Sequence, residues 1–200
     1  MSKVFELCLS QCLKLLFKVD ELQFGFVSGM GCQKALFSLE TVSNYFTKRG
    51  SPVFMAALDA SKAFDRVNHF ALLNKLIRIG VPLCLINVFL CWFLKLNGKV
   101  IWNGMFSAVF NMKSGVGQGR INSPWFFNVY INDLIMKLRN SGYGCCIGFV
   151  FVGCMFFADD ILLLSTSILH LQCMLELCGD YGSEFDILFN QKSHFYCKLV

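Results

Sequence analysis

Asp159 and Asp160 form an adjacent acidic pair between two apolar runs that are rich in Phe, Ile and Leu. The nearest basic residues along the sequence are Arg139 and His170, so no close neighbour in the chain neutralises the pair. These flanks and the turn preference of Asp predict a strand, a two-residue turn at Asp159-Asp160 and a second strand. Turn chemistry alone explains such a pair in an isolated hairpin. The alternative is a cation site, because two carboxylates at a hairpin tip repel each other unless a cation lies between them.

A third carboxylate, Asp59, follows an apolar run at 53–58 that is short enough to be a buried strand. If this strand and the acidic hairpin are neighbours in one sheet, Asp59, Asp159 and Asp160 meet at one edge. Carboxylate oxygens suit Mg²⁺, with Mn²⁺ as a second possibility, whereas zinc prefers His and Cys. Two such ions about 3.5–4 Å apart form the arrangement used for in-line phosphoryl transfer. If the Asp59 strand and the acidic hairpin are adjacent, they therefore indicate a site for phosphoryl transfer.

The elements that must position these residues alternate between helices and strands, which indicates an α+β fold with an antiparallel sheet and helices packed on one face. Asn68 and Ser123-Pro124 are typical helix starts, and Asn103-Gly104 is typical of a hairpin turn. Glycine-rich loops are expected at 23–33 and 114–122. The remaining expected elements are helices at 2–17, 33–48, 68–79, 82–95, 125–140 and 167–182, strands at 53–58 and 185–190, and hairpins at 97–112 and 148–165.

Composition limits the classes of protein to which the chain can belong. Its 200 residues are 56% hydrophobic, with 22 Phe, which is enough for one domain with a sizeable core. The net charge of +5 permits a nucleic-acid partner without demonstrating one. Eleven Cys without metal-type spacing indicate an intracellular protein with reduced thiols, in the nucleus or the cytoplasm. A membrane protein is disfavoured, because the apolar runs at 81–94 and 145–158 are shorter than the about 20 residues that spanning requires.

Four blocks occur together: AALDASKAFDRV at 56–67, SGVGQG at 114–119, Ser123-Pro124 followed by Phe127-Asn128, and FADD at 157–160. In this order and spacing they resemble reverse transcriptases, most closely those of the non-LTR (LINE-type) retrotransposon branch. QFGF at 23–26 resembles the fingers segment of the same branch. The resemblance covers essentially the whole chain. It implies an RNA-directed DNA polymerase domain, truncated at both ends, with partial fingers at about 1–52, a right-hand palm at about 53–200 and no thumb.

The resemblance also implies roles for individual residues near the reacting phosphate. Asp59, Asp159 and Asp160 match the catalytic metal ligands of the family, with Mg²⁺ or Mn²⁺ as the ion. Ala60 would offer its backbone near the metal and the triphosphate. Lys192 matches a lysine near the leaving pyrophosphate, although the segment around it is one residue shorter than the family spacing. Without the resemblance, Lys192 is an ordinary surface lysine.

Three further residues match positions that contact the incoming nucleotide and the template. Phe64 resembles the aromatic gate that excludes a 2′-hydroxyl by volume, the group that separates RNA from DNA building blocks. Gln118 and Gly119 resemble the loop that holds the nucleotide and template base. Taken alone, Phe64 would be a core residue and Gln118 an ordinary loop residue. The implied partners are an RNA template, a DNA primer and deoxynucleoside triphosphates, with no membrane and an open oligomeric state.

The second glycine-rich loop departs from the family pattern. Gly117 stands where Arg is usual, Arg120 where Gly or Asp is usual, and Asn122 where Leu is usual. We expect Arg120 to crowd the backbone at Gly119 and Asn122 to place an amide where an apolar contact is expected. These departures keep a second function open: a catalytically inactive mobile-element remnant with at most weak nucleic-acid binding.

Overall fold

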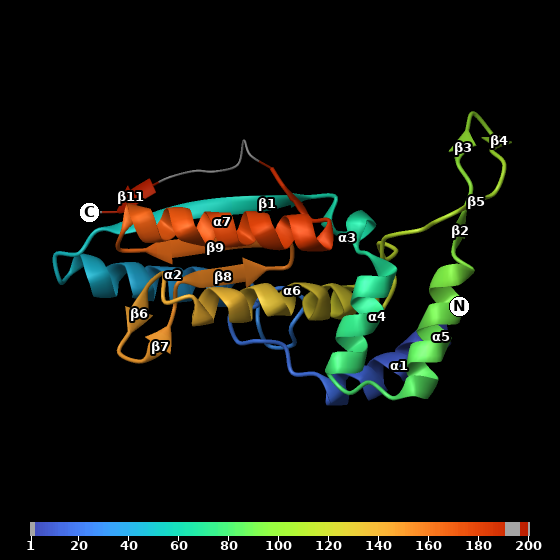
Figure 1. Ribbon diagram of the computed structural model, residues 1–200, viewed down its shortest axis with the longest axis horizontal. Coiled ribbons are helices and arrows are strands. Elements are labelled where there is room, and N and C mark those ends of the chain that lie inside the picture. Colours follow the sequence, from blue (N-terminus) through green and yellow to red (C-terminus); the bar gives the residue numbers. More distant parts are fainter. Residues whose placement is uncertain (1–2, 191–196, 200) are drawn as a thin grey trace. The chain divides into compact units, whose positions relative to one another are not determined.

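The computed structural model describes residues 3–190 and 197–199, and the chain divides into two compact units (Figure 1). The first unit contains Met1–Lys18 and Phe64–Tyr130, and the second contains Val19–Ala63 and Ile131–Val200. Helix α6 (Ser123–Asn140) contributes residues to both units. The units do not divide at residue 52, so the assignment of fingers at 1–52 and palm at 53–200 stays a prediction.

An antiparallel sheet forms the core of the second unit. Its central strands are β1 (Val53–Ser61) and β9 (Asp160–Ser165), and β8 (Cys154–Phe157) pairs with the free edge of β9. The short strands β10 (Leu188–Phe189) and β11 (Cys197–Leu199) both pair with β1. Strands β1, β8 and β9 are mostly apolar, and most of their residues are buried or half-buried, which is typical of a sheet covered on both faces.

Helices cover both faces of this sheet. Side chains on α2 (Cys32–Thr47) pack with Met55, Met155 and Leu164, which alternation and cross-strand pairing place on one face. Helix α7 (Ile168–Phe185) lies along β1 and β9 (Figure 1). Its residues line a cavity together with Leu58. Because side chains alternate along a strand, Leu58 belongs to the face of the sheet opposite to that of Met55. A small separate hairpin, β6 (Cys146–Ile147) with β7 (Val150–Phe151), precedes β8.

The first unit is mainly helical. It contains α1 (Lys3–Leu16), α4 (His69–Arg78), α5 (Leu83–Leu94) and the start of α6, and the short α3 (Ala63–Arg66) precedes α4. Its core is aromatic, with Phe89 and Phe126 in edge-to-face contact at 5.1 Å between ring centroids. The Asn68 side chain accepts a hydrogen bond from the Ala71 N–H at 3.0 Å and so caps α4, as the sequence predicts.

A hairpin extends beyond the end of α5 in the first unit (Figure 1). It pairs β2 (Asn97–Gly98) with β5 (Phe110–Asn111) and β3 (Ile101–Trp102) with β4 (Met105–Phe106). The turn lies at Asn103 and Gly104, both with positive φ, as the sequence predicts. Trp102 is 72% and Phe106 67% exposed, so this hairpin presents aromatic rings to solvent.

The expected α+β class with an antiparallel sheet is confirmed, and the structure adds that helices lie against both faces. Several element boundaries were wrong. Helix α7 continues to Phe185 instead of ending at 182, and the strand expected at 185–190 is only Leu188–Phe189. The hairpin expected at 148–165 begins at Cys154, after the separate β6–β7 hairpin. Strand β1 continues to Ser61 instead of ending before Asp59, because β10 pairs with Ala60 and Ser61. Helix α6 begins at Ser123, whose hydroxyl donates a hydrogen bond to the Gly117 carbonyl. Among the helices of the described residues, none combines the length and the apolar character that crossing a membrane requires.

Candidate active site

Asp59 and Asp160 face each other across the two central strands of the second unit. In the antiparallel register of β1 and β9, these two residues are direct partners. Directly opposed residues project from the same face of a sheet, with Cβ atoms about 4.5–5.5 Å apart. Both residues are exposed to solvent. The predicted adjacency of the Asp59 strand and the acidic hairpin is therefore confirmed.

Asp159 belongs to the turn between β8 and β9. The two turn residues are Ala158 and Asp159, one position earlier than predicted, because Asp160 is already paired with Asp59 as the first residue of β9. Within the described part of the chain, no three His, Cys, Asp or Glu side chains lie close enough together to hold a metal ion. Asp59 and Asp160 supply two oxygen ligands of the type that divalent ions prefer, without a third carboxylate in place beside them.

The acidic residues at this edge influence each other electrostatically. Partial burial, and then the negative charges of Asp159 and Asp59, raise the pKa of Asp160 above its ordinary value. Asp160 is therefore close enough to both Asp159 and Asp59 for their charges to act on it. A cation bound between them would remove this penalty, which is the expected property of a site that accepts a divalent ion.

Gln23 holds the turn that carries Asp159. Its side chain is fully buried, and its Oε1 accepts hydrogen bonds from the N–H groups of Ala158 at 2.9 Å and Gly25 at 2.8 Å. Ala158 has φ +59, a left-handed conformation that is unfavourable for a residue with a Cβ. Gln23 also forms an isolated parallel bridge with Phe156 of β8. Gln23 belongs to the QFGF segment, but its role at this turn could not be predicted because Ala158 lies 135 residues away in the sequence.

Gly25 is the second support of the same turn. A Cβ built on Gly25 would lie 2.2 Å from the Ala158 nitrogen and 2.9 Å from the Ala158 Cα. Backbone therefore approaches backbone at this point more closely than any side chain would allow. This close approach explains the glycine at position 25 of the first glycine-rich loop.

A cavity of about 480 Å³ opens beside the facing carboxylates in the second unit. Its walls are largely apolar and come from α2 and the sheet, and the carboxylates of Asp59 and Asp160 are its acidic groups. The volume lies within the range of about 300–1,000 Å³ that is usual for ligand sites. The other lining residues are Cys32, Ala35, Leu36, Leu39, Ala57, Leu58, Met155, Phe156, Phe157, Ile161 and Leu162.

The residues expected to contact the nucleotide and template lie in the first unit. The Phe64 ring is half-buried and stacks on Phe127, with 4.7 Å between centroids and 22° between ring planes. Gln118 and Gly119 are exposed in the second glycine-rich loop. Ala60 is buried in β1 of the second unit. Lys192 lies outside the described residues.

Arg120 lies against Gly117, and the expected crowding of Gly119 stays a prediction. A Cβ on Gly117 would lie 2.7 Å from the Arg120 Nε. The Arg120 side chain turns back across Gly117 because its guanidinium binds the Glu6 carboxylate. Asn122 is fully buried, and its Nδ2 donates a hydrogen bond to the Glu6 carbonyl at 3.0 Å, whereas its Oδ1 has no hydrogen-bond partner among the described residues.

The chain between residues 66 and 132 contains no Asp or Glu. Most of the first unit therefore carries positive charge that no acidic residue of the same segment offsets. Its exposed hairpin carries Lys99 and aromatic rings and is flanked by the exposed Lys95 and Lys113. The Lys99 ammonium lies 5.9 Å from the centroid of the Phe106 ring. The basic residues of the segment are Arg66, Lys75, Arg78, Lys95, Lys99, Lys113 and Arg120.

Comparison with known families and proteins gives one consistent match. Residues 1–198 match the family described as reverse transcriptase (RNA-dependent DNA polymerase). Over 175 residues the chain is 29% identical to the retrovirus-related Pol polyprotein from the type-2 retrotransposable element R2DM of Drosophila melanogaster, covering 86% of this chain and 16% of that protein. It is also 29% identical to a Pol polyprotein from the type-1 retrotransposable element R2 of Nasonia vitripennis, covering 78% of this chain and 15% of that protein.

Solved structures with the same fold include telomerases. The telomerase of Candida tropicalis in complex with a TWJ fragment of telomeric RNA has a TM-score of 0.70 and 14% identity, covering 96% of this chain and 33% of that chain. An apo telomerase of Candida tropicalis, truncated from the C-terminal domain, has a TM-score of 0.66 and 16% identity, covering 96% of this chain and 40% of that chain. At this identity the likeness establishes the fold.

Proposed function

Because the chain belongs to the reverse transcriptase family, in its non-LTR retrotransposon branch, we propose that it is the nucleotidyl-transfer part of an RNA-directed DNA polymerase. The primer 3′-hydroxyl oxygen attacks the α-phosphorus of a deoxynucleoside triphosphate, the new P–O bond forms as pyrophosphate leaves, and the hydroxyl proton is released. An RNA template selects the nucleotide by base pairing. The observation that carries the proposal is the pairing of Asp59 with Asp160 across β1 and β9, beside a cavity of ligand size.

Members of this family use divalent metal ions, and we assign Mg²⁺ to this chain, with Mn²⁺ as a substitute. Bound ions of this kind stabilise the charge that develops on the attacking and leaving oxygens. Asp59 and Asp160 would hold the ion through carboxylate oxygens, and Asp159 is the proposed third carboxylate. Ala60, the residue after Asp59 in β1, would offer its backbone beside the triphosphate.

In this proposal, the other site residues select and position the incoming nucleotide. Phe64 would exclude a 2′-hydroxyl, and its stacking on Phe127 supports that role because the contact restricts the motion of the ring. Gln118 and Gly119 would contact the incoming nucleotide and template base from an exposed loop. Lys192 would lie near the leaving pyrophosphate. Residues 1–52 and 53–200 would form part of the fingers and the palm.

Primer extension on an RNA template tests this function. We expect the purified protein to extend a DNA primer with deoxynucleotides in Mg²⁺ buffer, and Asp59→Asn to remove extension while leaving RNA binding unchanged. The substitution keeps the side-chain volume and removes one of the two facing carboxylates. Equal extension by both proteins would disprove the assigned site. Absence of extension by the unaltered protein, with retained RNA binding, would instead identify a catalytically inactive remnant.

The acid-free segment supports a nucleic-acid partner, and we expect its exposed hairpin to contact the phosphates of a single-stranded template. Replacing Lys95, Lys99 and Lys113 by Gln should lower the slope of log K against log salt concentration by about 2, since each phosphate contact on single strands contributes about 0.7. Fluorescence anisotropy of labelled RNA across a salt series measures this slope. The matched control replaces three exposed lysines of the same unit, Lys3, Lys14 and Lys18, by Gln. An equal change of slope in both triple variants would contradict a specific role for the hairpin.

The cysteines support an intracellular location for the protein. The cysteines of the described segments are free thiols, and burial raises the pKa of Cys145 and of Cys178 to about 12. A thiol with such a pKa is hardly ionised at neutral pH and reacts slowly with oxidants. Reduced thiols are usual inside cells, where glutathione and thioredoxin maintain them.

A further inference from the structure

Helix α1 is bound to the second glycine-rich loop through Glu6. The Glu6 side chain is only 3% exposed, although it carries a carboxylate. That carboxylate accepts hydrogen bonds from the Arg120 guanidinium at 3.3 Å and from the Ile121 N–H at 3.0 Å. The Glu6 carbonyl also accepts a hydrogen bond from the Asn122 amide at 3.0 Å. One helix residue therefore binds three consecutive loop residues, and all of these contacts lie within the first unit.

The loop residues bound by Glu6 close a tight turn. The Arg120 N–H donates a hydrogen bond to the Gly117 carbonyl at 3.3 Å, so Gln118 and Gly119 occupy the two central positions of a four-residue turn. Gly119 has φ +79, the conformation that a type II turn requires at its third residue. The Ser123 hydroxyl donates a second hydrogen bond to the same Gly117 carbonyl at 2.7 Å. Two hydrogen bonds to the Gly117 carbonyl thus fix the start of the turn, while Gln118 and Gly119 at its tip are exposed.

Gly117 leaves the space that the Arg120 side chain occupies. A Cβ on Gly117 would lie 2.7 Å from the Nε, 3.0 Å from the Cδ and 3.3 Å from the Cγ of Arg120. On its far end the Arg120 guanidinium lies 5.0 Å from the centroid of the Trp92 ring, within cation–π range. The arginine therefore crosses the turn from Gly117 to Glu6 and Trp92. A side chain at position 117 and the observed Arg120 conformation exclude each other.

We infer that Gly117, Arg120 and Glu6 form a three-residue cluster that positions the nucleotide-contacting turn. In this cluster Arg120 is a positioning residue that does not itself contact the substrate. The inference rests on the proposed function, which gives Gln118 and Gly119 their role at the incoming nucleotide. Arg120 closes the turn on one side and the buried Glu6 carboxylate fixes Arg120 on the other. Removal of the arginine leaves a buried carboxylate that keeps the Ile121 N–H but has lost its counter-charge, so the turn loses its fixed base and the protein loses stability.

Steady-state primer extension separates positioning from stability. Arg120→Gln should raise the KM for the deoxynucleotide about tenfold while changing kcat less than about twofold, because a turn that must order on binding weakens nucleotide affinity more than chemistry. Its melting temperature should also fall. Adding Glu6→Gln removes the unpaired buried charge, so the double variant should regain part of the melting temperature while its KM stays raised.

Gly117→Ala tests whether the three-residue cluster needs the space above Gly117 for the Arg120 side chain. Alone it should raise the KM for the deoxynucleotide, because the new methyl group displaces the Arg120 side chain. In the Gly117→Ala/Arg120→Ala double variant, the KM should be no higher than in Arg120→Ala alone, since the clash is gone. A product of the two single effects would overturn the inference, as would recovery of KM and melting temperature together in the Glu6→Gln double variant.

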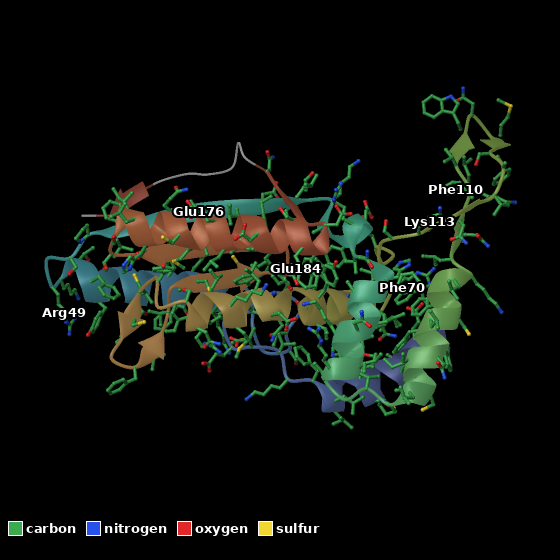
Figure 2. The ribbon with its side chains drawn as sticks, viewed as in Figure 1. Arg49, Phe70, Phe110, Lys113, Glu176 and Glu184 are labelled. Atoms are coloured by element: carbon green, nitrogen blue, oxygen red, sulfur yellow. The ribbon has the colours of Figure 1, made fainter. Side chains whose placement is uncertain are left out.

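Glu184→Gln is the matched control. The Lys137–Glu184 ion pair has a 2.8 Å contact but both side chains are about half exposed, and Glu184 lies on α7 of the second unit (Figure 2). Its loss should leave KM and melting temperature unchanged, as is usual for exposed pairs. If the unaltered protein does not extend primers, the proposed function fails. The melting temperatures of the Glu6 and Arg120 variants then still decide whether the three-residue cluster exists.

Discussion

Asp160→Asn removes nucleotide incorporation and at the same time raises the melting temperature of the metal-free protein at neutral pH. Activity falls because one of the two carboxylates paired across β1 and β9 is lost, and we expect a decrease in kcat/KM on the order of 10³-fold. Stability rises because the amide does not repel Asp59 and Asp159, the charges that contribute to the raised pKa of Asp160. Primer extension and differential scanning calorimetry measure the two effects.

The direction of the pH dependence follows from that raised pKa. In the folded chain Asp160 keeps its proton to a higher pH than in the unfolded chain, so the folded state binds more protons between the two pKa values. Stability therefore falls as pH rises through this window, and the penalty is fully present above it. Asp160→Asn should be more stable than the unaltered protein above the window and equally stable below it.

Mg²⁺ should act on the unaltered protein in the same direction as the substitution. A bound cation offsets the repulsion, so the melting temperature at neutral pH should rise with Mg²⁺ concentration in the unaltered protein and less in Asp160→Asn. Asp180→Asn, at an exposed position of α7, is the matched neutralisation and should change neither activity nor the Mg²⁺ response. A melting temperature for Asp160→Asn below that of the unaltered protein would contradict the repulsion.

The two strands of the central pairing could be predicted from the sequence, because the short apolar runs before Asp59 and after Asp160 are local signals of buried strands. Their adjacency was a hypothesis, since the runs are far apart in the sequence, and the structure confirms it. Asn68 and Asn103-Gly104 are equally local signals, since a cap and a two-residue turn depend only on adjacent residues. The structure confirms all three.

The features that could not be predicted depend on contacts between distant residues. The turn at Ala158-Asp159 is one residue earlier than the Asp159-Asp160 turn that residue preferences favour, and its left-handed alanine is supported by Gln23 from another part of the chain. The orientation of the Arg120 side chain depends on Glu6, 114 residues away in the sequence, which accepts a hydrogen bond from its guanidinium. The sequence shows only that Gln23 and Glu6 are polar residues in a largely apolar chain. That both side chains are buried is known from the fold.

The second large effect is expected at the Gln23 support of the catalytic turn. Gln23→Met keeps a side chain of similar length but removes the oxygen that accepts the N–H groups of Ala158 and Gly25. Each buried N–H left without a partner costs about 1–3 kcal/mol of folding free energy. Ala158 would then also lose the contact that stabilises its left-handed conformation. We expect a lower urea midpoint and a loss of primer extension.

Gly25→Ala should displace the same turn by a different route. Its new methyl group would lie 2.2 Å from the Ala158 nitrogen, which is backbone and cannot rotate away. Ala158 directly precedes Asp159, so the acidic residues must move with it, and a displacement of about 1 Å can reduce a catalysed rate on the order of 10²-fold. Gly179→Ala on α7 is the matched control, because no atom lies within 4 Å of its Cβ position and alanine favours the helix. If Gly25→Ala retained full primer extension with unchanged stability, the turn would not depend on this close approach. Loss of extension in Gly25→Ala and Gln23→Met, with Gly179→Ala active and at least as stable as the unaltered protein, would show that the first glycine-rich loop positions the acidic turn.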